Sequence, residues 1–252
     1  MQFQFDQTVI RINIPTRAAL MKAVEARFQA GEGFALATVN LDHLVKMQGD
    51  SDFVQAYAAQ DLVVADGRPI VALSQLAGRP VDLVPGSDMV LPLARLAAQQ
   101  GVKVALVGST QQALSDAERV LKTEAPEIDI VLSIAPSGIF DPDGSEAREI
   151  LEKLQAGDVG LCYLALGAPK QERLAALGRQ IAPRVGFASI GAGLDFLGGH
   201  QVRAPLWMRR AALEWVWRIL GAPGRMIPRY ARCFAILPVQ VVRALRLRGE
   251  KV

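Results

Sequence analysis

The stretch that decides the fold class is Val-Lys-Val-Ala-Leu-Val-Gly-Ser-Thr, residues 102–110. A short apolar run ends here in a glycine and two hydroxyl residues, and the segment Gln111–Glu124 that follows has the character of a helix. A run that is apolar except for one lysine near its start is typical of a strand that is buried on both faces of a parallel sheet. The stretch therefore predicts one βα unit of an α/β protein.

The same pattern recurs along most of the chain. Between the apolar runs lie segments with helical spacing of their apolar residues, such as Leu20, Val24 and Phe28. We therefore predict a Rossmann-like, largely parallel sheet with helices on both faces, in a domain of residues 1–200. The five other predicted strands are Phe34–Val39, Leu62–Ala65, Ile128–Ile134, Gly160–Leu166 and Val185–Ile190.

Composition and length narrow the class of protein. The 252 residues suffice for a full hydrophobic core. The hydrophobic share is 51% and the mean hydropathy is +0.22, but no uncharged apolar stretch is long enough to span a bilayer. The first residues lack the basic and apolar regions of a secretory signal. Two widely separated cysteines, Cys162 and Cys233, fit a reducing cytoplasm, and we expect neither a zinc site nor any cofactor.

The chain changes character at about residue 200. From Arg203 onward it has ten Arg and one Lys against two Glu, a net charge of +9, which leaves −6 for the first 202 residues. All three tryptophans, Trp207, Trp215 and Trp217, lie in this part. We predict a basic, helical appendage of residues 201–252, with helices at Leu206–Leu220 and Pro228–Arg248.

A basic appendage implies an anionic partner, either a membrane surface or a nucleic acid. Arginines interleaved with tryptophans and with the short apolar run Cys233–Val242 favour an anionic membrane surface over nucleic acid. A homo-oligomer is the alternative, in which apolar side chains such as Phe234 and Leu237 are buried between copies.

Almost every predicted strand ends in a cluster of glycines and polar residues. Because the carboxyl ends of parallel strands share one edge of a sheet, these clusters predict a ligand site there. Taken singly, each cluster could be only a turn or a helix cap. The cluster members are Thr38 and Asn40; Asp66 and Gly67; Gly108, Ser109 and Thr110; Ser137 and Gly138; Gly167 to Glu172; and Gly191 to Asp195.

Three of these clusters predict particular chemistry. Asp66 is placed to act as a general base, or else to cap the helix Arg68–Leu76. The amides of Gly108–Thr110 could bind a phosphate at a helix N-terminus. Lys170, Gln171 and Glu172 follow Pro169 in the first turn of a helix that faces the same edge. None of the clusters contains the Asp-x-Asp pattern of many metal-dependent sugar transferases, so a transfer here is expected to be metal-independent.

Seven motifs occur in an order that resembles the WecG/TagA/CpsF glycosyltransferases, and the resemblance extends over about residues 38–230. The Pro-Lys-Gln-Glu block and the Arg-Ala-Pro and Leu-Glu-Trp motifs are the most specific. The motifs are Thr38 to His43, Ala65-Asp66-Gly67, Pro85 to Asp88, Gly167 to Glu172, Gly193 to Gly199, Arg203-Ala204-Pro205, and Leu213-Glu214-Trp215 through Arg229-Tyr230.

The resemblance implies an inverting transfer of a hexose or N-acetylhexosamine-type sugar from a UDP-sugar to a polyprenyl-diphosphate-linked sugar, in cell-surface polysaccharide synthesis. It also implies a cytoplasmic protein that is peripheral on the inner face of the cell membrane. Asp66 matches the family's catalytic base. Thr38, expected beside it in the catalytic centre, matches a pocket-lining residue, as do Asn40, Gln171 and Asp195. Arg218 and Arg225 match arginines that the family's appendage brings to the diphosphate.

Two positions depart from the family pattern. Leu83 stands where the family usually has Arg, so Arg79 would have to supply a cation near the phosphates, and Pro228 replaces an Arg. Two other functions stay open at this point. A nicotinamide-dependent oxidoreductase acting on a sugar nucleotide would fit the fold, but the chain lacks both the Gly-x-Gly-x-x-Gly fingerprint and a Tyr-x-x-x-Lys pair. A non-catalytic adaptor would leave the polar strand ends unexplained.

Overall fold

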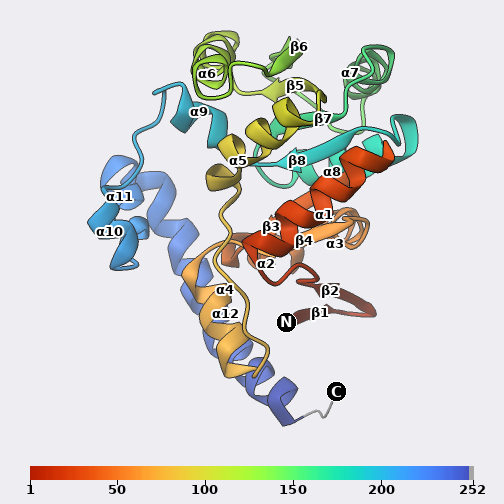
Figure 1. Cartoon of the computed structure of the whole chain (residues 1–252). Coiled ribbons are helices and arrows are strands. Elements are labelled where there is room, and N and C mark those ends of the chain that lie inside the picture. Colours follow the sequence, from red (N-terminus) through yellow and green to blue (C-terminus); the bar gives the residue numbers. More distant parts are fainter. Residues whose placement is uncertain (250–252) are drawn as a thin grey trace.

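A six-stranded, fully parallel sheet forms the centre of the molecule, with strand order β4-β3-β8-β7-β5-β6 (Figure 1). The computed structural model describes residues 1–249. All six predicted strands are confirmed, each within two residues of its predicted bounds, and so is the α/β, Rossmann-like fold class. The strands are β3 (Phe34–Val39), β4 (Leu62–Ala65), β5 (Lys103–Gly108), β6 (Asp129–Ile134), β7 (Leu161–Ala165) and β8 (Gly186–Ser189).

Helices cover both faces of the sheet. Side chains of α1, α5 and α6 pack with the strands into one hydrophobic cluster, and those of α7 and α8 pack into a second. A third cluster joins α2, α3 and α4 to the C-terminal helix. The helices of residues 1–200 are α1 (Arg17–Ala30), α2 (Leu41–Met47), α3 (Ser51–Ala58), α4 (Arg68–Leu76), α5 (Gly86–Gln99), α6 (Gln111–Glu124), α7 (Ser145–Ala156), α8 (Lys170–Ile181) and α9 (Gly193–Leu197).

A small antiparallel hairpin of β1 (Gln2–Phe5) and β2 (Thr8–Arg11) precedes the sheet and was not predicted. It forms its own two-stranded sheet. Phe3 and Ile10 are buried in the third cluster, so the hairpin covers part of the core near α3.

The C-terminal part is helical, as predicted, but its helices differ from the expected ones. The predicted helix Leu206–Leu220 is two helices, α10 (Leu206–Arg210) and α11 (Glu214–Gly221), because the chain turns at Ala212, which has a φ of 62°. The last helix, α12 (Pro223–Gly249), begins earlier than predicted, since proline suits the first position of a helix. It continues through Pro228 and Pro238, both exposed, where the carbonyls that lose a donor can be hydrated.

The helix α12 runs along α2 and α4 (Figure 1). Cys233 and Ala244 are its buried contacts in the third cluster. Within residues 1–249, no helix combines the length and the apolar character needed to cross a membrane.

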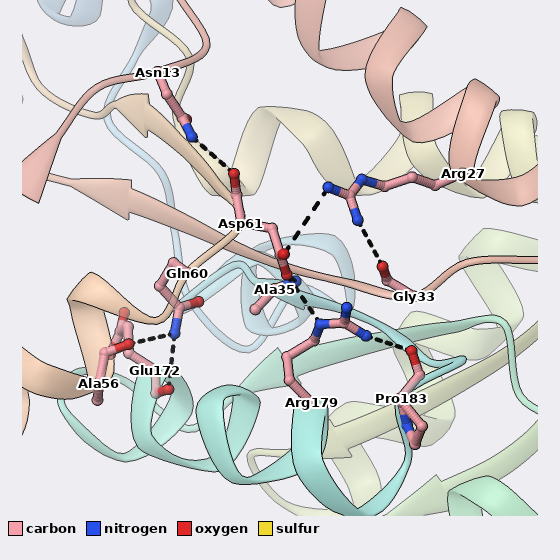
Figure 2. A network of polar contacts seen from close by, with 10 residues as sticks. All are labelled: Asn13, Arg27, Gly33, Ala35, Ala56, Gln60, Asp61, Glu172, Arg179 and Pro183. Atoms are coloured by element: carbon pink, nitrogen blue, oxygen red, sulfur yellow. Dashed lines mark hydrogen bonds and ion pairs between the residues drawn. The ribbon is translucent and has the colours of Figure 1, made fainter.

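The amino ends of the strands are held by a polar network centred on Asp61 (Figure 2). Its carboxylate accepts hydrogen bonds from the Ala35 amide at 2.8 Å and from Arg179 Nε at 3.0 Å, and it also faces Arg27. These residues tie α1, β3, β4 and α8 together at the edge of the sheet opposite the strand-end clusters. This network therefore stabilises the fold, and the strand-end clusters lie at the other edge.

Candidate active site

The carboxyl ends of β5 and β7 form a topological switch point. These strands are neighbours, but β5 leads on to β6 and β7 leads to β8, on the other side. Connections that leave in opposite directions open a crevice in which α/β proteins bind ligands. Gly108 makes the close approach possible, because a Cβ there would lie 2.4 Å from the carbonyl oxygen of Ala165.

Asp66 directly follows β4, and Asn40 directly follows β3. The Asn40 side chain caps α2 by accepting from the His43 amide at 3.0 Å, which turns its Nδ2 toward Asp66, 3.4 Å from Oδ2. Asp66 itself caps no helix, because Gly67, with a φ of 94°, occupies the capping position of α4 without a side-chain bond. The structure thus removes the helix cap as an alternative and leaves the carboxylate free for a ligand.

The surroundings of Asp66 make it a stronger base than an ordinary aspartate. Burial raises the pKa of Asp66 to about 6, and the charges of Glu214 and Asp88 act in the same direction. The hydrogen bond from Asn40 and the charge of Arg218 act against this rise. A carboxylate with a pKa near 6 is ionised at neutral pH and still basic enough to accept a proton in a transition state.

The N-terminus of α5 lies over the ends of β3 and β8. A Cβ on Gly86 would come within 3.1 Å of Ser189 O and 3.2 Å of Thr38 Cγ2, so a side chain here would be tightly crowded and the helix end lies close to both strands. Thr38 is buried beneath Gly86, two residues before Asn40 on the same strand. The first amides of a 14-residue helix are therefore directed toward the same edge as Asp66.

Gln171 and Glu172, in the first turn of α8, connect the loops that follow β7 and β8. Gln171 Oε1 accepts from the Gly191 amide at 3.1 Å, and its Nε2 donates to Glu172 Oε1 at 2.8 Å. Gln60 Nε2 donates to the backbone carbonyl of Glu172 at 3.1 Å (Figure 2).

Glu172 is completely buried. Burial raises its pKa to about 7, while the hydrogen bond from Gln171 acts against this rise. A side chain without solvent exposure whose carboxyl contacts Gln171 cannot touch a ligand in this conformation. We therefore assign Glu172 a positioning role in place of the direct contact that the sequence predicted.

Ser109 and Asp195 join the loop after β5 to the segment after β8. Ser109 has a left-handed backbone, with a φ of 55°, which is uncommon for a residue with a side chain. Its hydroxyl donates to Asp195 Oδ1, and Gln201 Nε2 donates to the other oxygen at 3.0 Å. Thr110 caps α6 by accepting from the Ala113 amide. This part of the crevice is therefore built by internal hydrogen bonds.

The C-terminal part reaches the same edge through several polar contacts. Arg203 pairs with Asp88 of α5, and Arg68 donates to the carbonyl of Arg209 at 3.2 Å. Arg218 pairs with Glu214 at 2.8 Å, and it lies close enough to Asp66 for its charge to oppose part of the rise that burial causes in the pKa of Asp66. Arg225 is exposed near the start of α12.

Lys170 is partly buried at the first position of α8, next to Gln171. Two other predicted contributors lie apart from this group. Gly138 is exposed in the loop after β6, the edge strand on the opposite side of the sheet from β4, and its neighbour Ser137 is held by Glu146 of α7. Arg79 faces a cavity of about 360 Å³ with Met1 and Arg11, so it does not replace the arginine missing at Leu83.

Asp-x-Asp patterns do occur elsewhere in the chain, at residues 50–52 and 141–143. Asp50 caps α3, while Asp52 and Asp143 both lie beside Arg173 of α8. These carboxylates therefore have structural partners away from Asp66. Within residues 1–249, no three His, Cys, Asp or Glu side chains are grouped as metal ligands.

Comparison with known proteins matches this arrangement to a family. The family model described as "Glycosyl transferase WecG/TagA/CpsF family" matches residues 6–251. A relative from Bacillus spizizenii, an N-acetylglucosaminyldiphosphoundecaprenol N-acetyl-beta-D-mannosaminyltransferase, is 26% identical over 205 residues, which cover 79% of this chain and 77% of the relative. The chain therefore belongs to the WecG/TagA/CpsF family of glycosyltransferases.

Proposed function

We propose that this glycosyltransferase moves a hexose or N-acetylhexosamine-type sugar from a UDP-sugar to a polyprenyl-diphosphate-linked saccharide in cell-surface polysaccharide synthesis. The observation that carries the proposal is Asp66, a carboxylate with a pKa of about 6 at a strand end, oriented by Asn40. The acceptor class is supported by the name of the relative, which acts on an N-acetylglucosaminyl-diphosphoundecaprenol.

The proposed reaction is a single displacement with inversion. The acceptor hydroxyl oxygen attacks the anomeric carbon and forms the new glycosidic bond, while its proton passes to Asp66. The bond between the anomeric carbon and the phosphate oxygen breaks, and UDP leaves with the electron pair. The Asn40 side chain, which caps α2, donates a long hydrogen bond of 3.4 Å to Asp66 Oδ2 and so helps to orient the base for the reaction.

The leaving diphosphate needs positive charge, for which we propose two sources. One is the N-terminus of α5, whose amides face the strand ends. The other is Arg218 with Arg225, from the C-terminal helices. Such groups stabilise the charge that develops on a leaving phosphate, so we propose a metal-independent transfer. The ends of β4 and β5 are four strand spacings apart, about 19 Å along the sheet, and this span suits an extended sugar nucleotide.

We further propose that residues 201–252 are an appendage that binds an anionic membrane surface at the inner face of the cell membrane, next to a lipid-linked acceptor. Several large apolar side chains of this part are exposed, including Trp207 at 64% and Leu220 at 72%. Not all of the aromatic and apolar residues are free for this contact. Trp215 packs against Tyr230 and Phe234, and Leu237 packs inward on the third cluster, but Phe234 is still 48% exposed and available to a membrane or to a second copy.

A binding experiment separates this function from its rivals. Thermal unfolding would be followed with UDP, NAD and a single-stranded oligonucleotide, each tested at 100 times a typical dissociation constant. A ligand at 100 times its Kd stabilises the fold by about 2.7 kcal/mol, or about 5–10 °C for a chain of this size. We expect this shift with UDP. A shift with NAD alone would support an oxidoreductase, and a shift with the oligonucleotide alone would support an adaptor.

A further inference from the structure

Asp42, the second residue of α2, is a carboxylate shared by two cations from separate parts of the chain. Its side chain is only 12% exposed. The same oxygen, Oδ2, lies 2.9 Å from Arg229 Nη2 of α12 and 3.1 Å from Lys46 Nζ, one turn further along α2. Both contacts are ion pairs by distance, while Oδ2 accepts no hydrogen bond of good geometry, so the attraction is electrostatic and is strengthened by the low exposure of Asp42.

Lys46 extends this contact to the active-site edge. Its Nζ also donates to the carbonyl of Ala168 at 2.8 Å. Ala168 follows β7 and precedes Pro169, in the loop that leads directly to Gln171 and Glu172. Four groups thus form an unbroken series, from Arg229 on α12 through Asp42 and Lys46 to the loop after β7.

Packing joins the same elements. The side chains of Ala168, Leu44 and Cys233 belong to one hydrophobic cluster, so the loop, α2 and α12 share a surface. The contact between Asp42 and Lys46 depends on the charges around it. Lys46 and Arg229 both approach one oxygen of Asp42 and would repel each other without that carboxylate. Without Arg229, the mostly buried Asp42 would have Lys46 as its one remaining cation among these residues.

We propose that Asp42 and Lys46 are positioning residues that transmit the docking of α12 to the loop Gly167–Pro169. When Arg229 is in place, Asp42 holds Lys46, and Lys46 fixes the carbonyl that sets the start of α8. Through Gln171, this start also fixes the Gly191 loop. Docking of the appendage then shapes the part of the crevice that is formed by Gln171 and the Gly191 loop, where we expect the donor to bind. It also brings Arg218 near Asp66. The proposal rests on the transferase function proposed above.

A pair of substitutions tests this series through turnover. Arg229→Gln removes the first contact, and Lys46→Met removes the last. Turnover would be measured with a short-chain acceptor in detergent, so that membrane binding does not limit the rate. We expect each variant to lose about fivefold or more in kcat/KM for the donor. The double variant should lose no more activity than the more impaired of the two single variants, because both changes interrupt one series.

Matched variants control for charge. Arg232→Gln removes a charge from the same helix but not the contact with Asp42, and Lys22→Met makes the lysine change on the exposed face of α1. Arg229→Lys keeps the charge and should recover most of the activity, which a role confined to packing would not predict. Losses in the double variant that multiply would show two independent contacts and would overturn the proposal.

Hydrogen exchange gives a second readout that needs no activity. The amides of Gln171 and Arg173 bond to the carbonyls of Gly167 and Pro169. We expect Arg229→Gln to speed exchange in residues 167–173 by about fivefold or more, although Arg229 lies outside this segment. Unchanged exchange there, with faster exchange in Lys46→Met, would refute transmission from α12. A protein that transfers no sugar would overturn the proposed function, while this measurement would still decide the present proposal.

Discussion

Replacing Asp66 by Asn should lower turnover and raise stability at the same time. The amide has the size of the carboxyl and can still accept the hydrogen bond from Asn40, but it cannot take the proton of the acceptor. Removal of a general base costs about 10²–10⁴-fold in rate. Because base catalysis requires the ionised carboxylate, wild-type kcat/KM should fall about tenfold per pH unit below a pKa of about 6. The Asn variant should lack this dependence.

The stability gain follows from the raised pKa. A carboxyl whose pKa rises from 3.8 to about 6 on folding favours the protonated form, so the folded state loses stability as pH rises from about 4 to 6. The full difference would be about 3 kcal/mol, and the partial exposure of Asp66 reduces it to about 1–2 kcal/mol. Calorimetry should therefore show Tm of Asp66→Asn about 2–8 °C above wild type at pH 8 and unchanged at pH 4.

Two results would refute this reasoning. Turnover near the wild-type level in the Asn variant would show that Asp66 is not the base. A Tm that falls equally at pH 4 and pH 8 would show that this side chain stabilises the fold in a way that does not depend on its ionisation.

The remaining predictions concern the supporting residues. Glu172→Gln should raise the free energy of unfolding by about 3 kcal/mol at pH 9 and leave it unchanged at pH 4, because burial raises the pKa of Glu172 to about 7. An equal change at both pH values in calorimetry would contradict this prediction. Gln171→Ala and Asp195→Ala should each raise the donor KM or lower kcat by about tenfold or more, while the far-UV spectrum stays native. Unfolding of both variants would show that these positions are purely structural. Deleting residues 203–252 should abolish sedimentation with anionic liposomes and most transfer while weak UDP binding remains, since each arginine near an anionic leaflet contributes about 1 kcal/mol. A truncated protein as active as the full chain would contradict a role for the appendage in the site. Arg218→Ala should instead keep liposome binding and lower turnover.

The sheet could be predicted because its signal is local. Strands buried on both faces are continuous apolar runs, so β3 and β7 appear in the sequence with nearly their true bounds. Asp66 and Asn40 could be placed for the same reason, since a residue that directly follows a parallel strand must lie at the carboxyl edge. Gly138 lies four residues beyond the end of β6, the edge strand on the opposite side of the sheet from β4, and neither this distance from Asp66 nor the strand order has a local signature in the sequence.

The hairpin and the course of the C-terminal helices could not be predicted in the same way. β1 and β2 have four residues each, too few for a clear period, and their burial depends on contacts with α3. Residues 206–220 have a helical pattern throughout, and nothing in that pattern marks Ala212, where the left-handed backbone interrupts the helix. The contact between Asp42 and Arg229 joins residues that are far apart in the chain, so only the folded arrangement shows it.

The central claim, transfer from a UDP-sugar with Asp66 as base, is tested most directly by a donor screen. Purified protein would be incubated with a panel of UDP-hexoses and UDP-N-acetylhexosamines and a short-chain polyprenyl-diphosphate-linked N-acetylglucosamine, and the lipid product would be followed by mass spectrometry. We predict that one donor yields a lipid heavier by a single sugar, with UDP released in equal amount, and that Asp66→Asn forms this product about 10²–10⁴-fold more slowly. If the wild-type protein forms no such product from any donor, or if Asp66→Asn forms it at the wild-type rate, the claim is contradicted.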